Sequence, residues 1–133
     1  MSCGSGLRPR IAQVALLLLA AASAAAGDTT TVPHLLAAPD AAEGKVVDVR
    51  GWLRPHVLYL FPSRELAEAR DWKSALIVGD DPSGGIRDSD CPGRFVTITG
   101  TFRNLDPGIY GLVEIRRIEL ADGTVCWPAQ PAE

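Results

Sequence analysis

The residues best suited to chemistry in this 133-residue chain lie in one short segment, GDDPSGGIRDSDC at residues 79–91. It brings together four carboxylates, those of Asp80, Asp81, Asp88 and Asp90. A calcium loop of the EF-hand kind needs oxygen ligands at alternate positions and a final glutamate, and this segment lacks that spacing. Pro82, Gly84 and Gly85 are typical turn residues. We therefore expect a solvated turn and no metal ion, with a weak calcium site at Asp88 and Asp90 as the alternative.

Few residues are suited to acid–base or nucleophilic catalysis. The chain has two histidines, His34 and His56, and neither belongs to a motif that would pair it with a nucleophile or a metal. The motifs GxSxG, HExxH and CxxC are absent from the sequence, and so is a glycine-rich phosphate loop. We expect no catalytic residues and no cofactor, with a small hydrolase as a less favoured alternative.

Aromatic and cationic side chains offer a different chemistry, because rings beside arginines suit sugars, bases or a protein partner. Trp52 lies between Arg50 and Arg54 along the sequence. The candidate ligand-binding residues are Arg50, Trp52, Arg54, Tyr59, Trp72 and Phe95. The alternative is that Trp52 and Phe95 cover a second small core under a helix or the tail, since a small barrel needs large apolar side chains at its ends.

The cysteines predict a disulfide. Cys3 lies in the N-terminal segment, which leaves Cys91 and Cys126 as a pair 35 positions apart. With no CxxC motif and no histidine nearby, a zinc site is the poorer interpretation. We expect a disulfide between Cys91 and Cys126, which would stabilise the fold by about 3 to 4 kcal/mol in the chain-entropy model.

The N-terminal segment has the pattern of a secretory signal peptide. Two arginines precede an apolar run at residues 11–21, and the alanines at 24–26 offer a small-residue cleavage site. The run is shorter than the roughly 20 apolar residues of a spanning helix. We therefore expect cleavage after residue 26, no stable membrane insertion, and a periplasmic or secreted protein, with a retained anchor as the alternative.

Removal of this segment would leave 107 of the 133 residues, which fits one small domain. The loss of Arg8 and Arg10 reduces the 13 Lys and Arg residues to 11, against 16 Asp and Glu, so the net charge becomes −5. An acidic chain disfavours non-specific binding to nucleic acid, which needs clustered Lys and Arg. The expected partners are proteins or envelope glycans.

Apolar alternation with a period of two predicts five short strands. They are expected at residues 45–54, 56–61, 74–78, 94–102 and 112–120. In the first, Val47, Val49 and Leu53 share a face with Gly51, and a glycine inside a strand often marks a bulge or a tight coil. The fifth strand loses its alternation at residues 116–117, which predicts a bulge there.

Helix and turn signals connect these strands. Ser63 is a good N-cap for one short helix over residues 63–71. Residues 32–38 predict a single helical turn that Pro39 ends. The turn sequence NLDPG at residues 104–108 joins the last two strands into a hairpin, and both expected disulfide cysteines then fall at its open end.

The sequence thus predicts a mainly β protein: a small five-stranded OB-like barrel with one short helix and one disulfide. The segments GKVVDVRGWL, SALIVGD and CPGRFVTITGTF resemble the strands of OB-fold modules, and more narrowly those of small exported bacterial proteins of unknown function. The resemblance covers residues 40–120. It implies binding of oligonucleotides, oligosaccharides or proteins. One departure is that the helix lies between strands two and three, whereas OB-folds usually carry it between three and four.

The expected organisation is a signal peptide at 1–26, a lead segment at 27–44, the barrel at 45–127 and an irregular tail at 128–133. We interpret the chain as a non-catalytic exported module that binds a protein or an envelope glycan. A secreted inhibitor or accessory subunit acting through the loop at 80–90 is the alternative. A nucleic-acid-binding OB protein is less favoured because of the acidic charge.

Overall fold

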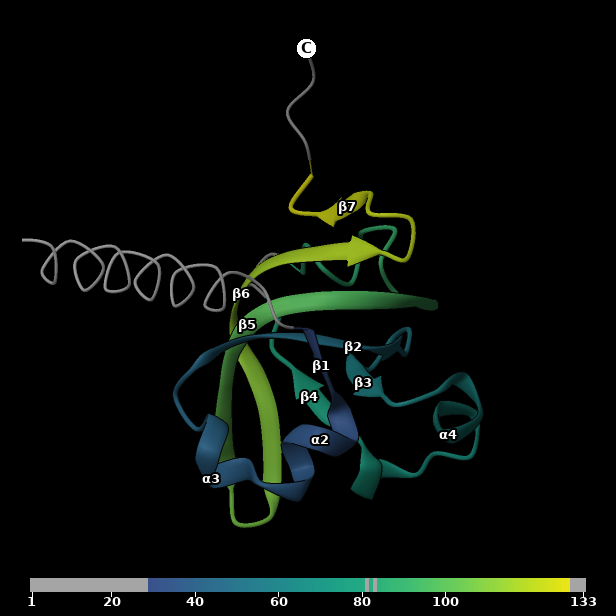
Figure 1. The fold of residues 1–133 in the computed structure, drawn as a ribbon. Coiled ribbons are helices and arrows are strands. Elements are labelled where there is room, and N and C mark those ends of the chain that lie inside the picture. The colour runs from purple at the N-terminus through teal and green to yellow at the C-terminus, as the bar shows by residue number, and fades with distance from the viewer. Residues whose placement is uncertain (1–28, 81, 83, 130–133) are drawn as a thin grey trace, which may run out of the picture.

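Five strands close into a barrel in the computed structural model, which describes residues 29–80, 82 and 84–129 (Figure 1). They are β2 (Val46–Leu53), β3 (Tyr59–Phe61), β4 (Leu76–Val78), β5 (Arg94–Asp106) and β6 (Ile109–Leu120). Neighbours follow the order β2, β3, β4, β6, β5, and pairing between β2 and β5 closes the circle. Only the β4–β6 pair among these is parallel. This confirms the predicted mainly β, five-stranded barrel and is consistent with an OB-like fold.

The predicted signal peptide at residues 1–26 and the side chain of Asp81 lie outside the described residues, as do residues 130–133. The lead segment is described from Thr29 onward and packs on the barrel. It forms β1 (Thr29–Thr31), which runs parallel to β2, and then the short helices α2 (Val32–Ala37) and α3 (Pro39–Ala42). Because Val32 is fully buried, the lead segment contributes to the main core.

The predicted helix is α4 (Arg64–Glu68), and it lies between β3 and β4 as expected. The Ser63 hydroxyl caps it by accepting a hydrogen bond from the amide of Leu66 at 3.2 Å. Two further α-helices accompany it: α2 matches the predicted helical turn, and α3 was not expected. Pro39 begins α3 instead of only ending α2, because the first turn of a helix needs no N–H donor there. Within the described part of the chain, no helix is both long and apolar enough to span a membrane.

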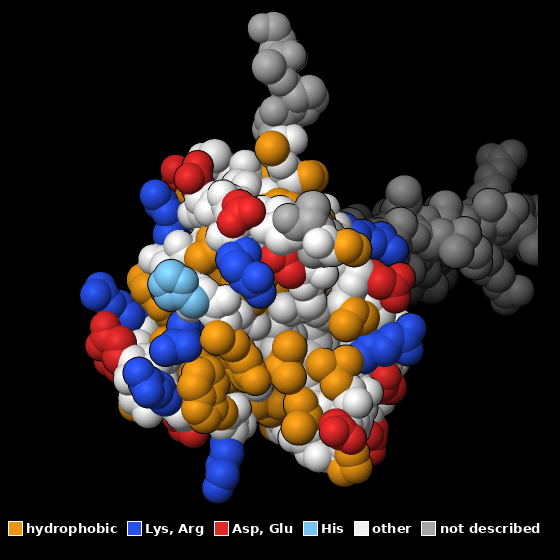
Figure 2. Space-filling model, turned by 180° about the vertical axis from the view of Figure 1, so that it is seen from behind, with side chains coloured by type: hydrophobic (Ala, Val, Ile, Leu, Met, Phe, Trp, Pro, Cys, Tyr) orange, Lys and Arg blue, Asp and Glu red, His pale blue; other side chains and the backbone are white. Residues whose placement is uncertain are grey.

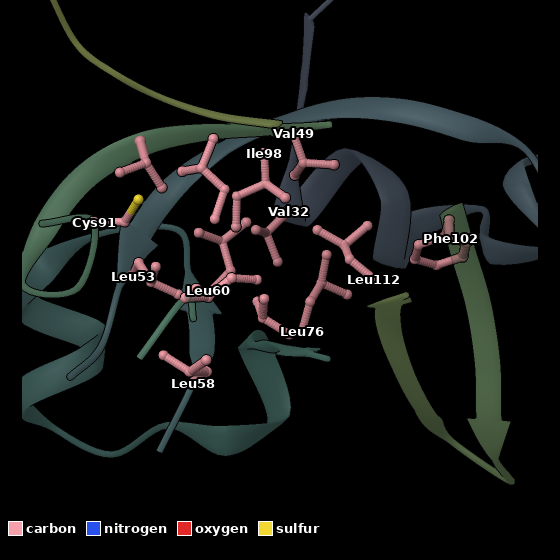
Figure 3. Close-up of a cluster of buried hydrophobic side chains, with 14 of the residues drawn as sticks. Val32, Val49, Leu53, Leu58, Leu60, Leu76, Cys91, Ile98, Phe102 and Leu112 are labelled. Atoms are coloured by element: carbon pink, nitrogen blue, oxygen red, sulfur yellow. The ribbon is translucent and has the colours of Figure 1, made fainter. Parts of the chain in front are cut away.

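The main core fills the barrel interior (Figure 3). The predicted inward faces are confirmed, since Val49, Leu53 and Ile98 are fully buried. Gly51 explains how β2 approaches β3 so closely: a Cβ at this position would lie 2.6 Å from the carbonyl oxygen of Phe61. A side chain at residue 51 would therefore force these two strands apart.

Two strand boundaries differ from the sequence-based expectation. The second strand was expected from residue 56 but begins at Tyr59, because His56 adopts a positive φ of 71° that no strand accommodates. The third begins at Leu76 instead of residue 74, since a 3-10 turn, η2 (Trp72–Ser74), precedes it. Loop 54–58 between β2 and β3 is consequently longer than predicted.

The β5–β6 hairpin extends further than the apolar pattern indicated. Pairing continues to Asp106 and Ile109, so the predicted turn at Pro107 and Gly108 is confirmed but is tighter than expected. The predicted bulge is present between the pairs Thr99–Arg117 and Thr101–Val113. A strand that was not predicted, β7 (Val125–Trp127), pairs with β6 at the end of the expected barrel region, just before the expected tail at 128–133.

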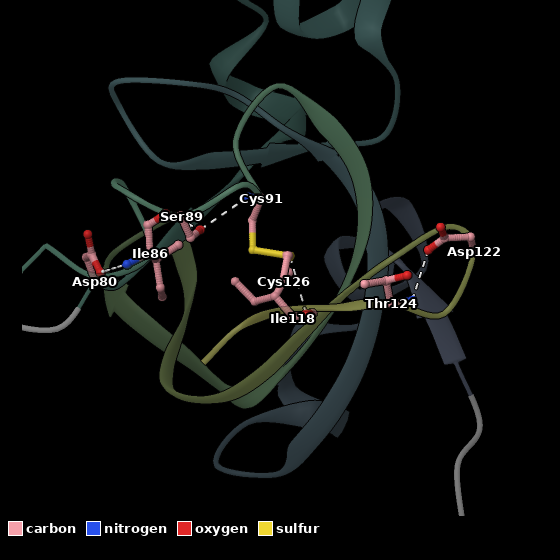
Figure 4. The surroundings of a disulfide bond; sticks show 8 residues. All are labelled: Asp80, Ile86, Ser89, Cys91, Ile118, Asp122, Thr124 and Cys126. Atoms are coloured by element: carbon pink, nitrogen blue, oxygen red, sulfur yellow. Dashed lines mark hydrogen bonds between the residues drawn. A yellow bond between two sulfur atoms is a disulfide. The ribbon is translucent and has the colours of Figure 1, made fainter. Parts of the chain in front are cut away.

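The predicted disulfide joins Cys91 to Cys126 with a Cα–Cα distance of 5.5 Å (Figure 4). Cys91 is fully buried just before β5, and Cys126 lies in β7. The bond therefore ties β7 to the open end of the hairpin, where the sequence placed it.

Candidate binding surface

A second hydrophobic cluster lies outside the barrel, between β3 and α4. Phe61, Ala67 and Ala75 form its buried centre, and Trp52, Tyr59 and Leu66 pack against them; we call this set the outer cluster. The capped helix α4 brings Ala67 down onto Phe61, whose side chain points away from the barrel interior. The alternative in which Trp52 covers a second small core beneath a helix is therefore what the structure contains.

Three aromatic rings and one guanidinium meet at the edge of the outer cluster. The ring of Trp72 lies edge-on to Tyr59 at 4.8 Å between centroids and tilted against Phe61 at 5.6 Å. The guanidinium of Arg54 lies 5.2 Å from the centre of the Trp72 ring. We call these four residues the Trp72 cluster. Trp72 is 43% exposed although it is held on several sides, so it presents a large apolar side chain of fixed orientation to solvent.

The space-filling view shows how apolar and basic side chains are distributed on the rear of the molecule (Figure 2). Hydrophobic side chains gather over the lower part of this face, and Lys and Arg side chains lie beside them at its left. Aromatic residues and Arg are enriched at protein interfaces, so apolar surface bordered by basic side chains is compatible with an interface on this face.

Trp52 and Phe95 form a cross-strand pair on the outer face of β2 and β5. Trp52 is half-buried, and the guanidinium of Arg64 lies 5.5 Å from the centre of its ring. Phe95 remains 38% exposed and does not join the outer cluster. Arg50 lies on β2 opposite Thr97, four residues before Arg54 along the chain, and it is not part of the Trp72 cluster. Of the six predicted residues, the structure thus brings Arg54, Tyr59 and Trp72 into one group.

Two shallow hollows have Trp52 and Gly93 in common in their linings. One, of about 380 Å³, is lined by Trp52, Gly93, Arg94, Phe95, Leu120, Ala121 and Asp122. The other, of about 350 Å³, is lined by Trp52, Arg54, Pro55, Arg64, Ala67, Glu68, Arg70 and Gly93; we call it the arginine hollow. A third hollow, of about 500 Å³, is lined by Arg50, Phe95, Val96, Thr97, Glu119, Leu120, Ala121 and Gly123.

Sequence reasoning missed three residues of this surface, Phe61, Arg64 and Arg70. Phe61 follows Leu60 in an apolar run, and the alternation that points it outward was visible in the sequence. Arg64 stands four residues before Glu68, and their side chains form an ion pair with an Nε–Oε1 distance of 2.9 Å. This spacing is a sequence signal for a helix-surface pair, but it does not show which ring lies beneath it.

The acidic loop is held by hydrogen bonds within itself (Figure 4). The carboxylate of Asp80 accepts hydrogen bonds from the amides of Ile86 at 2.9 Å and Arg87 at 3.1 Å. Ile86 is buried in the main core, which anchors the loop from below. Among the described residues, which omit Asp81, no group of three or more His, Cys, Asp and Glu side chains is placed to hold a metal ion. The carboxylate of Asp80 therefore stabilises the turn through these two hydrogen bonds.

Hydrogen bonding perturbs one surface carboxylate near the first hollow. The pKa of Asp122 is lowered from its ordinary value because its carboxylate accepts a hydrogen bond from the amide of Thr124 at 2.9 Å, with a smaller contribution from the charge of Arg94. The two histidines lie apart from this carboxylate in the fold: His34 is on α2, and His56 is exposed in loop 54–58. Neither is placed by a hydrogen bond to Asp122.

No family model, no curated protein and no solved structure matches this chain.

Proposed function

We propose that this chain is an exported, non-catalytic module that binds a protein partner through the Trp72 cluster. The observation that carries the proposal is the half-exposed indole of Trp72, fixed by Tyr59, Phe61 and Arg54. Trp, Tyr and Arg are the residue types that contribute most binding energy at protein interfaces. A side chain already held in one orientation loses little conformational entropy when a partner packs on it.

Several features favour a protein over the other partners considered from the sequence. One face of each indole, in Trp52 and in Trp72, already carries a guanidinium, at 5.5 and 5.2 Å, which leaves less open ring surface for a sugar. The hollows beside Trp52 are shallow and broad, as at protein interfaces. The expected net charge of −5 disfavours nucleic acid.

The proposal that the module is exported rests on two supports. The Cys91–Cys126 disulfide is typical of oxidising compartments outside the cytosol. The basic and apolar N-terminal pattern, which lies outside the described residues, is typical of a signal peptide.

Capture of a partner from an envelope extract tests the proposal. The full-length oxidised chain is immobilised, and the proteins it retains are compared with those retained by the variant Trp72→Ala. Truncation of a hot-spot tryptophan lowers the free energy of binding by about 2 kcal/mol or more, so we expect the affinity for the partner to fall by roughly thirtyfold. The matched control is Val46→Ala, which removes a side chain of similar exposure, 46%, at the far end of β2.

The same two variants separate the possible partners. Equal retention of the partner by wild type and Trp72→Ala would contradict the proposal. A melting-temperature rise with glycan fragments that is lost in Trp72→Ala would assign the cluster to a glycan instead. A rise with short single-stranded oligonucleotides would contradict the argument from charge.

A further inference from the structure

The arginine hollow beside α4 differs in charge from the rest of the chain. Three guanidinium groups line it, those of Arg54, Arg64 and Arg70, against one carboxylate, that of Glu68. Glu68 is already paired with Arg64 at 2.9 Å. Within the described residues, no carboxylate lies within 4.0 Å of Arg54 or Arg70. The lining therefore carries a local charge of +2 on a chain whose net charge is −3.

The backbone at Arg70 is unusual for an arginine. Its φ is +57°, a left-handed conformation in which glycine is the favoured residue. Arg70 follows the end of α4, where its amide donates to the carbonyl of Ala67 at 3.1 Å and the amide of Asp71 donates to that of Leu66 at 3.1 Å. This pair of bonds is the Schellman arrangement, which usually has glycine at the position of Arg70. The helix cap thus requires the left-handed backbone, and the residue that adopts it here, Arg70, also lines the arginine hollow.

The lining of the arginine hollow is also partly apolar. Trp52, Pro55 and Ala67 supply the apolar part of it. A guanidinium presents parallel N–H donors that match the two oxygens of a carboxylate. Apolar surface beside such donors suits a carboxylate attached to a short hydrocarbon, as in glutamate or aspartate side chains.

We propose that the arginine hollow is a carboxylate subsite that receives an acidic side chain of the protein partner. Arg54 and Arg70 bind the carboxylate, and Trp52 packs against the methylene groups. This inference rests on the proposed function, because the hollow adjoins the Trp72 cluster through Arg54, which lies over the Trp72 ring and also lines the hollow. On an acidic chain, a local positive site fixes the orientation in which an acidic partner docks.

A titration monitored by NMR tests the subsite directly. The probes are a capped acidic pentapeptide, GELEG, and its neutral counterpart, GQLQG, added to the full-length oxidised chain. We expect GELEG to shift the indole N–H resonance of Trp52 and the Nε–H resonances of Arg54 and Arg70 in a saturable manner, with GQLQG at least tenfold weaker. The shifts should diminish as salt is raised, since the site is open to solvent.

The variant Arg70→Gly separates binding from folding. It removes the guanidinium and relieves the left-handed strain, so GELEG should bind about tenfold more weakly while the melting temperature rises by about 3 to 5 °C. A variant that simply misfolds would lose both. The matched control is Glu114→Gly, which relieves a φ of +49° in β6, away from the hollow; its melting temperature should rise, and its affinity for GELEG should stay unchanged.

Equal binding of GELEG and GQLQG, or unchanged affinity in Arg70→Gly, would overturn the subsite. So would displacement of GELEG by inorganic phosphate at equal concentration, because the site would then recognise charge without preference for a carboxylate. Capture of a partner that depends on Trp72 but is unaffected by Arg70→Gly would retain the proposed function and remove the carboxylate subsite. Binding of GELEG that depends on Arg70, without a partner that depends on Trp72, would retain the subsite and remove the Trp72 cluster from the interface.

Discussion

The main core and the outer cluster are both hydrophobic, but the first is mainly aliphatic, the second is rich in aromatic rings, and they are enclosed differently. The main core is surrounded by the barrel strands and closed by α2, the acidic loop and the disulfide. The outer cluster is covered by a five-residue helix, and Trp72 stays 43% exposed at its edge. A fully enclosed core stabilises the fold, whereas a partly covered cluster leaves apolar surface that a partner can bury. We therefore expect the main core to supply most of the stability, and we propose the outer cluster as the site of recognition.

The largest expected effect tests that assignment at two buried phenylalanines. Phe102 lies in the main core and stacks on Tyr110 at 5.6 Å, and Phe61 lies at the centre of the outer cluster. Phe102→Ala should lower the free energy of unfolding by about 3 to 5 kcal/mol, because the enclosing strands cannot collapse into the cavity. Phe61→Ala should lower the free energy of unfolding by less, because the short helix α4 can move inward and fill part of the cavity. Urea denaturation measures both free energies of unfolding. Equal losses in the two variants would show that the outer cluster is as rigidly enclosed as the main core.

Removal of the disulfide comes next. Replacing Cys91 and Cys126 together by serine should lower the free energy of unfolding by about 3 to 4 kcal/mol, since the bond closes a loop of 35 residues. Under mild denaturant, the indole N–H resonance of Trp127 in the NMR spectrum should lose its native position before that of Trp72 does. The variant Val46→Ala serves as a control for a small surface change. Simultaneous loss of both signals would show that the outer cluster has no stability of its own.

A smaller effect is expected at two helix caps. Ser63 caps α4 over the outer cluster, and the Thr31 hydroxyl caps α2 over the main core by accepting from the amide of His34 at 3.3 Å. Each substitution by alanine should cost about 1 kcal/mol. Ser63→Ala should raise hydrogen exchange only at α4 amides, whereas Thr31→Ala should lower the global melting temperature. The opposite pattern would contradict the assignment of stability to the main core.

The smallest effect concerns Asp122, in the β6–β7 turn. Its lowered pKa means that the ionised carboxylate stabilises the folded state above the ordinary value of 3.8, and that this contribution is lost as the pH falls through the lowered pKa. Asp122→Asn should therefore have a slightly lower melting temperature than wild type near pH 7, and the difference should disappear near pH 2. A difference that persists in acid would show that packing, and not the charge, accounts for it.

The barrel was predictable because local patterns carry most of the information. Alternation in residues 94–102 predicted that Val96 and Ile98 face inward, and both are buried. β1 and β7 were not predicted, because three-residue strands show too little alternation to be recognised and form only where a longer strand offers its edge. His56 has a left-handed backbone, so β3 begins only at Tyr59. The sequence gives no sign of this conformation, because the usual sign is a glycine and residue 56 is a histidine.

The candidate surface was predictable only in part. The sequence placed Arg54, Tyr59 and Trp72 among the binding candidates because of their types, and the structure joins them. It also placed Arg50 and Phe95 there, which join neither the outer cluster nor the Trp72 cluster, because the sequence pattern does not show which strand and which helix lie next to each residue. Arg64 and Arg70 were missed because they reach the surface around Trp52 only once α4 packs over Phe61.

By itself, the sequence determined the inward and outward faces of the strands, the β5–β6 turn, the N-cap of α4 and the pairing of the two cysteines. The first three follow from interactions between residues close in the chain. The cysteine pairing follows because only two cysteines remain once Cys3 is assigned to the N-terminal segment. The tertiary structure alone decided that Arg54, Arg64 and Arg70 line one hollow with Trp52 beside α4. The physical reason is that Phe61 points out of the barrel and its ring must be covered. Burial of that ring places α4, which begins at Arg64 and ends two residues before Arg70, against the outer side of β3.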